Sequence, residues 1–348
     1  MHKLDAIPGR TVKTDGNEYL YFSGTSYLGM GCNEAFSELI TEGIKKYGNN
    51  YSSSRISNLQ LKIVEEAEEY LCHNFGSEAA LTMSSGYMAG QIVVQMLLAK
   101  QIHEFIYAPG THPALWRTSE DFFAGNHNAW AERALQGVID SRAKKLAILC
   151  NALDPLYAEK HAFDWISELP HDKEVVLVID DSHGLGVTGQ NGRGVLSELK
   201  VPENVTLIVV SSLGKALGIP GGVIFSTSAV IGALKKSAFF GGSSPIAPAY
   251  LFAFLRAGTI YQKAREKLLK NVSMFSLNMN NVEQFRFIPG YPVYYTKNRA
   301  LAEKLLEKEI LISSFPYPTV DDDWVTRIII SSLHTASDIE ALVAGLKS

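Results

Sequence analysis

Short runs of apolar residues recur through the middle of the chain and alternate with stretches of helical periodicity. The apolar runs cover 79–83, 104–108, 145–150, 175–180, 206–210 and 222–226. Helical patterns cover 34–47, 60–76 and about 88–98. Unbroken apolar strands that alternate with helices are typical of a sheet covered on both faces. The pattern therefore predicts an α/β fold with a mostly parallel central sheet and helices on both faces.

The last hundred residues have a different pattern. A long helical pattern runs from about 245 to 279, and a closing helical pattern covers 337–346. Short strand patterns lie between them near 285–287, 292–295 and 327–331. We interpret 246–348 as a smaller α+β domain and 46–245 as the large α/β domain. Residues 1–45 would form an N-terminal arm that packs on the small domain.

Composition and charge exclude several functional classes. The 348 residues are 46% hydrophobic and 20% charged, with a net charge of −4, so we expect no nucleic-acid partner. The longest apolar segments are too short to span a bilayer, so we expect no membrane partner. The cysteines, Cys32, Cys72 and Cys150, fit neither a zinc-site spacing nor a disulfide framework. We therefore expect no metal and a reducing, cytoplasmic compartment.

Polar residues and glycines follow directly after the predicted strands. Ligands of open α/β sheets bind beyond the carboxyl ends of the strands, so these residues should meet at one edge. They are Ser84, Ser85, Gly86, His112, Asp180, His183, Ser212 and Lys215.

Two of these residues suggest a particular chemistry. A lysine can form a covalent bond to a carbonyl compound when burial and neighbouring cations lower its pKa, although a lysine in a glycine loop can also be an ordinary surface residue. Lys215 stands in such a setting, in SSLGKALGIPGG (211–222). Asp180 ends an apolar strand, where it can cap a turn or pair with a buried cation such as a protonated pyridine nitrogen.

The remaining residues complete the requirements of one cofactor. The Ser-Ser-Gly turn at 84–86 precedes a helix, and a helix N-terminus attracts anions such as phosphate. His112 could stack on a flat ring, and His183 could donate to a ring hydroxyl. A lysine, a strand-end carboxylate, a phosphate site and a stacking ring together predict pyridoxal 5′-phosphate.

Five segments resemble those of the α-oxoamine synthases, which are fold-type I pyridoxal-phosphate enzymes of the class II aminotransferase superfamily. They are SGTSYLGM (23–30), SSGYMAG (84–90), VVLVIDDSHGLGVTGQNGRG (175–194), SSLGKALGIPGG (211–222) and TRIIISSLHT (326–335). The family includes 8-amino-7-oxononanoate synthase and 2-amino-3-ketobutyrate CoA ligase. The resemblance spans about residues 20–345, and the segments at 180–194 and 211–222 are the most specific.

The resemblance implies a role for each matched residue. Lys215 would hold the cofactor as a Schiff base and move the substrate's α-proton, and Asp180 would pair with the pyridine nitrogen. His183 would reach the phenolic oxygen, and His112 would stack on the ring. The phosphate would be held by the residues Ser85, Gly86, Tyr87 and Ser212, and by Ser244 across the interface of a homodimer with a shared active site.

The substrate side of the resemblance is less complete. Arg327 would bind the amino acid carboxylate, and Thr25 stands where the family has a substrate-side Asn. Cys150 replaces an acidic residue, and THPALW (111–116) and ISNLQLK (56–62) depart from the family pattern. Three functions therefore stay open at this point: condensation of an amino acid with an acyl-CoA thioester, amino transfer without CoA, and a cofactor-binding protein with little catalysis.

Overall fold

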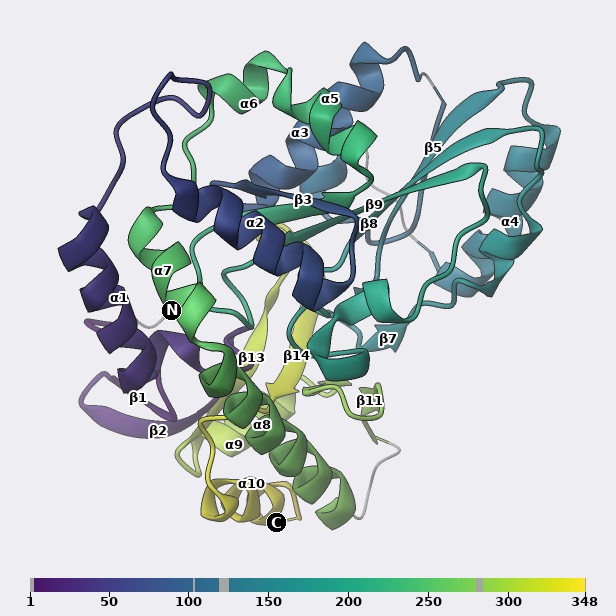
Figure 1. The fold of residues 1–348 in the computed structure, drawn as a ribbon. Helices are drawn as coiled ribbons and strands as arrows, with labels where there is room; N and C mark the ends of the chain where they lie inside the picture. The colour runs from purple at the N-terminus through teal and green to yellow at the C-terminus, as the bar shows by residue number, and fades with distance from the viewer. Residues whose placement is uncertain (1–2, 103, 119–124, 280–283, 348) are drawn as a thin grey trace.

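The computed structural model describes residues 3–102, 104–118, 125–279 and 284–347. In this part of the chain, two six-stranded sheets lie one above the other in the view of Figure 1, each with its own helices. The upper sheet belongs to the middle of the chain, and the lower one joins the two ends.

The first sheet has the order β3-β10-β9-β8-β5-β4. Its strands are β3 (Ala79–Met83), β4 (Phe105–Tyr107), β5 (Lys145–Asn151), β8 (Glu174–Asp180), β9 (Val205–Ser212) and β10 (Gly222–Ser226). Strands β4, β5, β8 and β9 pair in parallel, whereas β10 is antiparallel to both β9 and β3. Five of its six strands therefore run in one direction, and the predicted mostly parallel α/β sheet is confirmed.

Alternate residues of each strand face opposite layers of helices, as the two-residue period of a strand requires. On β8, Val178 packs in the cluster that contains α3 (Gly86–Ala99) and α5 (Ser228–Lys235). Its neighbours Leu177 and Ile179 pack in the other cluster, with α2 (Lys62–Phe75), α4 (His127–Asp140) and α7 (Pro248–Arg256). Side chains on both faces of the sheet are thus buried, and Figure 1 shows helices on either side of it.

The second sheet has the order β1-β2-β13-β14-β12-β11. Its strands are β1 (Thr11–Thr14), β2 (Asn17–Phe22), β11 (Arg286–Phe287), β12 (Val293–Thr296), β13 (Ile310–Pro316) and β14 (Trp324–Ile329). β2 pairs in parallel with β13, which places N-terminal residues in the sheet formed by the C-terminal part of the chain. The predicted boundaries between the N-terminal arm, the large domain and the small domain, at 45/46 and 245/246, stay a prediction.

The long helix predicted over 245–279 is wrong as a single element. The chain forms α7 and then α8 (Gly258–Asn278), which are separated at Ala257. Ala257 is fully buried and lies outside ideal helical geometry, with φ −85° and ψ 10°, and the following Gly258 is a poor helix former. The apolar periodicity continues through this break, which is why the pattern did not reveal it.

The other elements are shorter or lie at the ends of the chain. The helices are α1 (Glu34–Tyr47), α6 (Ala238–Gly242), α9 (Ala300–Leu306) and α10 (Ala336–Lys347). A small hairpin joins β6 (Leu153–Asp154) to β7 (Glu159–Lys160). Single 3₁₀ turns occur at Met30–Cys32, Pro113–Leu115, Asp164–Glu168, Gln190–Gly192 and Gly194–Ser197. The sequence patterns did not predict helices α4, α5, α6 and α9, strands β1 and β13, or the β6–β7 hairpin.

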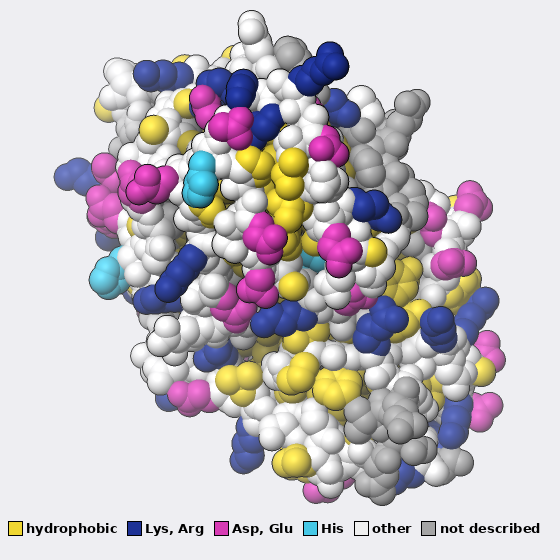
Figure 2. All heavy atoms as spheres, turned by 90° about the vertical axis from the view of Figure 1, so that its right-hand side faces the viewer, with side chains coloured by type: hydrophobic (Ala, Val, Ile, Leu, Met, Phe, Trp, Pro, Cys, Tyr) yellow, Lys and Arg dark blue, Asp and Glu magenta, His cyan; other side chains and the backbone are white. Residues whose placement is uncertain are grey.

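The surface around α4 carries charges of both signs. On the face shown in Figure 2, basic and acidic side chains are intermixed and do not gather into separate fields. Among the described residues, no helix has the length and apolar character needed to cross a membrane.

A buried histidine pair makes the fold sensitive to acid. The rings of His127 and His161 stack with centroids 3.7 Å apart, and both side chains are buried. Burial and the neighbouring His161 lower the pKa of His127 to about 3 from an ordinary value of 6.5. The unfolded chain therefore takes up this proton near pH 6.5, whereas the folded chain does so only near pH 3.

We expect the free energy of unfolding to fall as the pH drops from 6.5 towards 3, by roughly 2–4 kcal/mol from His127. Denaturant unfolding at several pH values measures this loss. The variant His127→Phe keeps an aromatic ring at the position and should show a smaller loss over the same range. Equal pH dependence in wild type and variant would contradict the assignment to His127.

Candidate active site

The site begins at Asp180, the last residue of β8. Its carboxylate is buried, and Oδ1 accepts a hydrogen bond of 2.9 Å from the backbone N–H of Ser182. Oδ2 lies 3.8 Å from Nδ1 of His112. The carboxylate therefore lies at the carboxyl end of the central strand β8, as the sequence predicted for a strand-end residue.

Lys215 follows β9 in a turn that the backbone closes on both sides. Leu213 donates its N–H to Gly221, and Ile219 donates its N–H to Leu213. Burial lowers the pKa of Lys215, the charge of Asp180 acts against this, and the charge of Arg327 lowers the pKa further. A larger neutral fraction makes the amine a better nucleophile at physiological pH than an ordinary lysine.

His112 lies beside Asp180, and two hydrogen bonds fix its position. Its backbone N–H donates to Oδ1 of Asn151 at 3.1 Å, and its ring Nδ1 accepts from the backbone N–H of Ala114 at 3.2 Å. Burial lowers the pKa of His112, although Asp180 raises it. The imidazole is thus favoured in its neutral form, which suits stacking on a ring.

Asn151 is a positioning residue that the sequence did not reveal. Besides the bond to His112, its Nδ2 donates to the carbonyl of Gly110 at 2.6 Å. The side chain is buried at the end of β5, one strand away from Asp180. The only available signal was its position directly after an apolar strand.

The preceding residue, Cys150, points the other way. It is fully buried in the apolar cluster beneath the sheet, and burial raises the pKa of its thiol far above the ordinary value. A protonated, buried thiol is inert. Cys150 therefore cannot replace an acidic residue as a charged group at this site.

The N-terminus of α3 meets the end of β9 at Gly86. A Cβ on Gly86 would lie 2.8 Å from Cα and Cβ of Ser212, so only glycine fits this contact. Ser85 caps the helix by accepting the N–H of Met88 at 3.0 Å. Among the described residues, the N–H groups of Gly86 and Tyr87 in the first turn of α3 have no hydrogen-bond acceptor, so they can bind an anion.

Ser212 links this helix start to the loop after β8. Its backbone N–H donates to Oγ of Ser182 at 2.8 Å, and its Oγ accepts from the N–H of Gly214 at 3.2 Å. Ser182 therefore contacts both Asp180 and Ser212, and it brings the carboxylate and the helix start into one site. Reasoning from sequence gave Ser182 no role.

His183 points towards the second sheet. Its Nδ1 lies 2.9 Å from the hydroxyl of Tyr27, which in turn lies 3.1 Å from the hydroxyl of Tyr291. Burial lowers the pKa of His183 well below its usual value, and the charges of Lys215 and Arg327 lower it further. His183 is therefore neutral and close to both cations.

Arg327 reaches the site from β14. Its guanidinium is buried, and Nη1 donates to the carbonyl of Pro155 at 2.7 Å. Its Nε has no partner among the described residues. A buried donor without a partner is costly, so this nitrogen is available to an anionic ligand such as a carboxylate.

Two predicted site residues lie apart from this cluster. Ser244 is exposed in the loop between α6 and α7. Thr25 is half-buried two residues before Tyr27, and its carbonyl accepts the Tyr27 N–H at 2.9 Å. The side chain of Tyr87 is exposed, so the part of this residue predicted to bind phosphate is its backbone N–H.

A second carboxyl group lies directly behind the first. Asp181 is buried, accepts the N–H of Val195 at 2.8 Å and packs against Gly184 and Gly194. Burial raises the pKa of Asp181 to about 8, and the charge of Asp180 adds to this. No group of three or more His, Cys, Asp or Glu suited to a metal occurs in the described ranges.

The sequence model of class I and II aminotransferases matches residues 148–346, which is more than half of the chain. The matched part includes Asp180, His183, Lys215 and Arg327. It begins within β5 and ends in α10, so it contains most of both sheets.

Two relatives are similar over nearly the whole length. An 8-amino-7-oxononanoate synthase of Petrotoga mobilis is 27% identical and is matched over 97% of this chain and 90% of the relative. An enzyme with the same name from Fervidobacterium nodosum is 25% identical over the same shares. These relatives agree with the family resemblance noted in the sequence.

Solved structures share the fold. A serine palmitoyltransferase of Sphingomonas wittichii superimposes with a TM-score of 0.83 at 17% identity and covers 99% of this chain and 91% of its own. A structure of SPT with PLP gives a TM-score of 0.82 at 17% identity over 100% and 91%. An 8-amino-7-oxononanoate synthase from Francisella tularensis gives 0.73 at 22% identity over 94% and 97%.

Proposed function

This chain belongs to the class I and II aminotransferase family, and on that basis we propose that it is a pyridoxal-phosphate-dependent transferase of the α-oxoamine synthase type. It condenses an amino acid with an acyl-CoA thioester, as an 8-amino-7-oxononanoate synthase-like enzyme. One observation carries this proposal: three features lie together at one edge of the first sheet. They are Lys215 with its lowered pKa, the buried carboxylate of Asp180 at the end of β8, and the N-terminus of α3, where only glycine fits at position 86.

The residues at this edge fit the cofactor. Asp180 supplies an anion for the ring nitrogen, and His112 supplies a neutral flat ring beside it. The free N–H groups of α3 and the hydroxyl of Ser212 suit the phosphate, and Gly86 leaves the space that close approach requires. Lys215 has the lowered pKa that covalent attachment requires.

When bound, pyridoxal phosphate withdraws electrons from the α-carbon of an amino acid and so makes that carbon able to react as a nucleophile. Lys215 would hold the cofactor through Nζ and would move a proton at the substrate α-carbon. Asp180 would hold the ring nitrogen in its charged state, which withdraws electrons best. Arg327 would bind the substrate carboxylate through its unpartnered Nε. A substrate-side role for Thr25 rests on the family resemblance alone.

Amino transfer without CoA is the alternative. The altered segments at 56–62 and 111–116, together with the inert Cys150, lie on the acyl-CoA side of the family resemblance and favour it. A cofactor-binding protein with little catalysis is disfavoured, because Lys215, Asp180 and Arg327 retain the charges and contacts that catalysis needs.

A panel of single amino acids, each with and without acyl-CoA thioesters, separates these functions. We expect release of free CoA thiol that requires one particular amino acid and one acyl group together. Each substrate alone, and the Lys215→Ala variant with both, serve as controls. Release of a keto acid in the absence of any thioester would overturn condensation in favour of amino transfer.

We further propose a homodimer in which Ser244 reaches the partner's phosphate site. The exposed side chains of Ile56 and Leu59 favour an interface at the segment 56–59. A groove of ≈ 630 Å³ is lined by Ile56 and by Pro245, which is next to Ser244. We expect a dimer by sedimentation equilibrium and weaker cofactor binding in Ser244→Ala; an active monomer would contradict both.

We place the protein in the cytoplasm, with the chain divided into an arm (1–45), a large domain (46–245) and a small domain (246–348). The thiols of Cys32, Cys72 and Cys150 are free, which suits a reducing compartment. Localisation of a tagged full-length chain tests the compartment, and limited proteolysis near 45 and 245 tests the division.

A further inference from the structure

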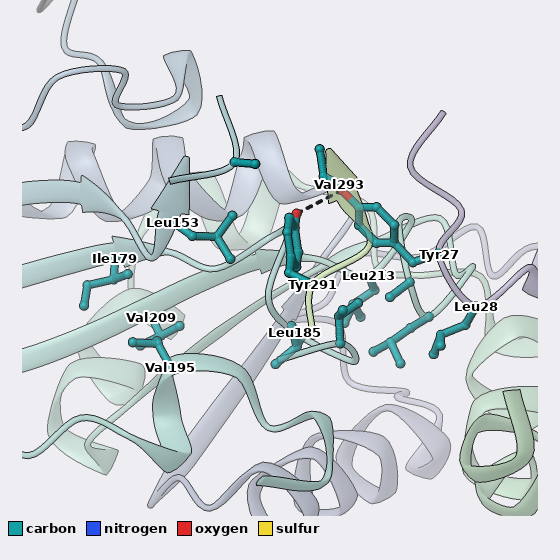
Figure 3. Close-up of a cluster of buried hydrophobic side chains, with 14 of the residues drawn as sticks. Tyr27, Leu28, Leu153, Ile179, Leu185, Val195, Val209, Leu213, Tyr291 and Val293 are labelled. Atoms are coloured by element: carbon teal, nitrogen blue, oxygen red, sulfur yellow. Dashed lines mark hydrogen bonds between the residues drawn. The ribbon is translucent and has the colours of Figure 1, made fainter. Parts of the chain in front are cut away.

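Two buried tyrosines form a hydrogen-bonded chain that ends on His183. Tyr27 Oη lies 2.9 Å from His183 Nδ1 and 3.1 Å from Tyr291 Oη. Both tyrosine side chains are at most 1% exposed. Figure 3 shows the two rings side by side in the apolar cluster, with the bond between their hydroxyl groups drawn as a dashed line.

The side chains of Tyr27, Tyr291 and His183 are all neutral. Burial raises the pKa of Tyr27, and it raises the pKa of Tyr291 well above the ordinary value of 10.0. Burial likewise lowers the pKa of His183 well below 6.5. Each phenol therefore keeps its proton, and the imidazole carries one proton on either Nδ1 or Nε2.

Only one arrangement gives both phenol protons an acceptor. If His183 Nδ1 donated to Tyr27, then Tyr27 would donate to Tyr291, and the buried Tyr291 proton would have no acceptor. In the described part of the chain, the Tyr291 hydroxyl contacts no hydrogen-bond partner except Tyr27. In the reverse arrangement Tyr291 donates to Tyr27 and Tyr27 donates to His183 Nδ1. A buried donor without an acceptor costs free energy, so the reverse arrangement is favoured.

We propose that Tyr27, oriented by Tyr291, is a positioning residue that fixes His183 as the Nε2–H tautomer. His183 then presents Nε2–H as a donor on the side of its ring away from Tyr27. The identity of the acceptor, the phenolic oxygen of the cofactor, rests on the proposed function. The tautomer itself is set by the hydrogen bonds of Tyr27 and Tyr291 and does not depend on the cofactor.

The three residues come from distant parts of the sequence. Tyr27 follows β2, His183 follows β8, and Tyr291 precedes β12. The first and last belong to segments that lead into the second sheet, whereas His183 lies at the edge of the first. The protonation of a site residue is therefore set by the packing of one sheet on the other.

The tautomer can be measured directly by NMR of the full chain labelled with ¹⁵N-histidine, before and after addition of pyridoxal phosphate. The variant His183→Gln identifies the His183 signals by their loss. We expect the Nε2–H form of His183 in wild type without cofactor. Tyr27→Phe removes the donor and should lower the ratio of Nε2–H to Nδ1–H by about fivefold, the ratio that one net hydrogen bond provides. Tyr291→Phe should lower the ratio by a smaller factor.

Tyr294→Phe is a matched control, because Tyr294 is also buried but its hydroxyl bonds to Ser276 at 2.7 Å. It should leave the His183 tautomer unchanged. An Nδ1–H form in wild type, or an unchanged ratio in Tyr27→Phe, would overturn the proposal. An unchanged ratio in Tyr291→Phe would remove Tyr291 from it. If pyridoxal phosphate failed to bind while the tautomer results held, the proposed function would be wrong and this inference would stand.

Discussion

Replacing Lys215 by alanine is expected to lower the turnover number by about 10³-fold or more. Proton transfer by a positioned side chain contributes roughly 10²–10⁴-fold, and this variant loses the covalent anchor of the cofactor as well. The change should not unfold the protein. Burial lowers the pKa of Lys215, which means that the folded state holds this cation at a cost. Steady-state kinetics and thermal unfolding of the same preparation measure both effects.

Lys236→Ala is the control for this variant. Lys236 is an exposed lysine after α5, and its removal should change neither turnover nor unfolding temperature. Borohydride reduction of the wild-type protein with pyridoxal phosphate, followed by peptide mass spectrometry, should place the label on Lys215. A label on another lysine, or a Lys215→Ala variant that keeps wild-type turnover, would contradict the assignment.

The residues at the strand ends could be predicted because each strand of the first sheet is recognisable from the apolar residues of its own short segment. Each apolar run of the first sheet is short and is followed by a proline or a small polar residue, so the carboxyl end of each strand can be read from its own segment. The structure places Asp180 at the end of β8 and Lys215 just after the neighbouring strand β9. The fold class and the family are confirmed, whereas the roles of the individual residues stay proposals.

The contacts between the two sheets could not be predicted in this way. Tyr27 and Tyr291 are 264 residues apart, and each follows the ordinary pattern of a buried aromatic residue. Nothing in either local segment indicates the other. Strand β13 was missed for a related reason: its serines and final proline do not resemble a buried strand, and it is defined by pairing with β2 and β14. Such pairings depend on the packed structure.

The second large effect is expected at Gly86, where α3 meets β9. In Gly86→Ala the new methyl group would lie 2.8 Å from Cα and Cβ of Ser212, so the helix start must move away from the strand end. Overpacking of this kind costs about 1–3 kcal/mol of stability. The same movement displaces the N–H groups that suit the phosphate. We therefore expect the dissociation constant for pyridoxal phosphate to rise about tenfold or more, since tenfold corresponds to about 1.4 kcal/mol.

Gly137→Ala separates this effect from the general cost of replacing a helical glycine. Gly137 lies in α4, and a Cβ there would meet no atom within 4 Å. Alanine should therefore stabilise that helix by roughly 0.5–1 kcal/mol and leave cofactor affinity unchanged. Denaturant unfolding and absorbance titration with pyridoxal phosphate give both quantities for each variant. If Gly86→Ala bound the cofactor as tightly as wild type, the junction of α3 with Ser212 could not be the phosphate site, because the two cannot keep their positions around an added methyl group.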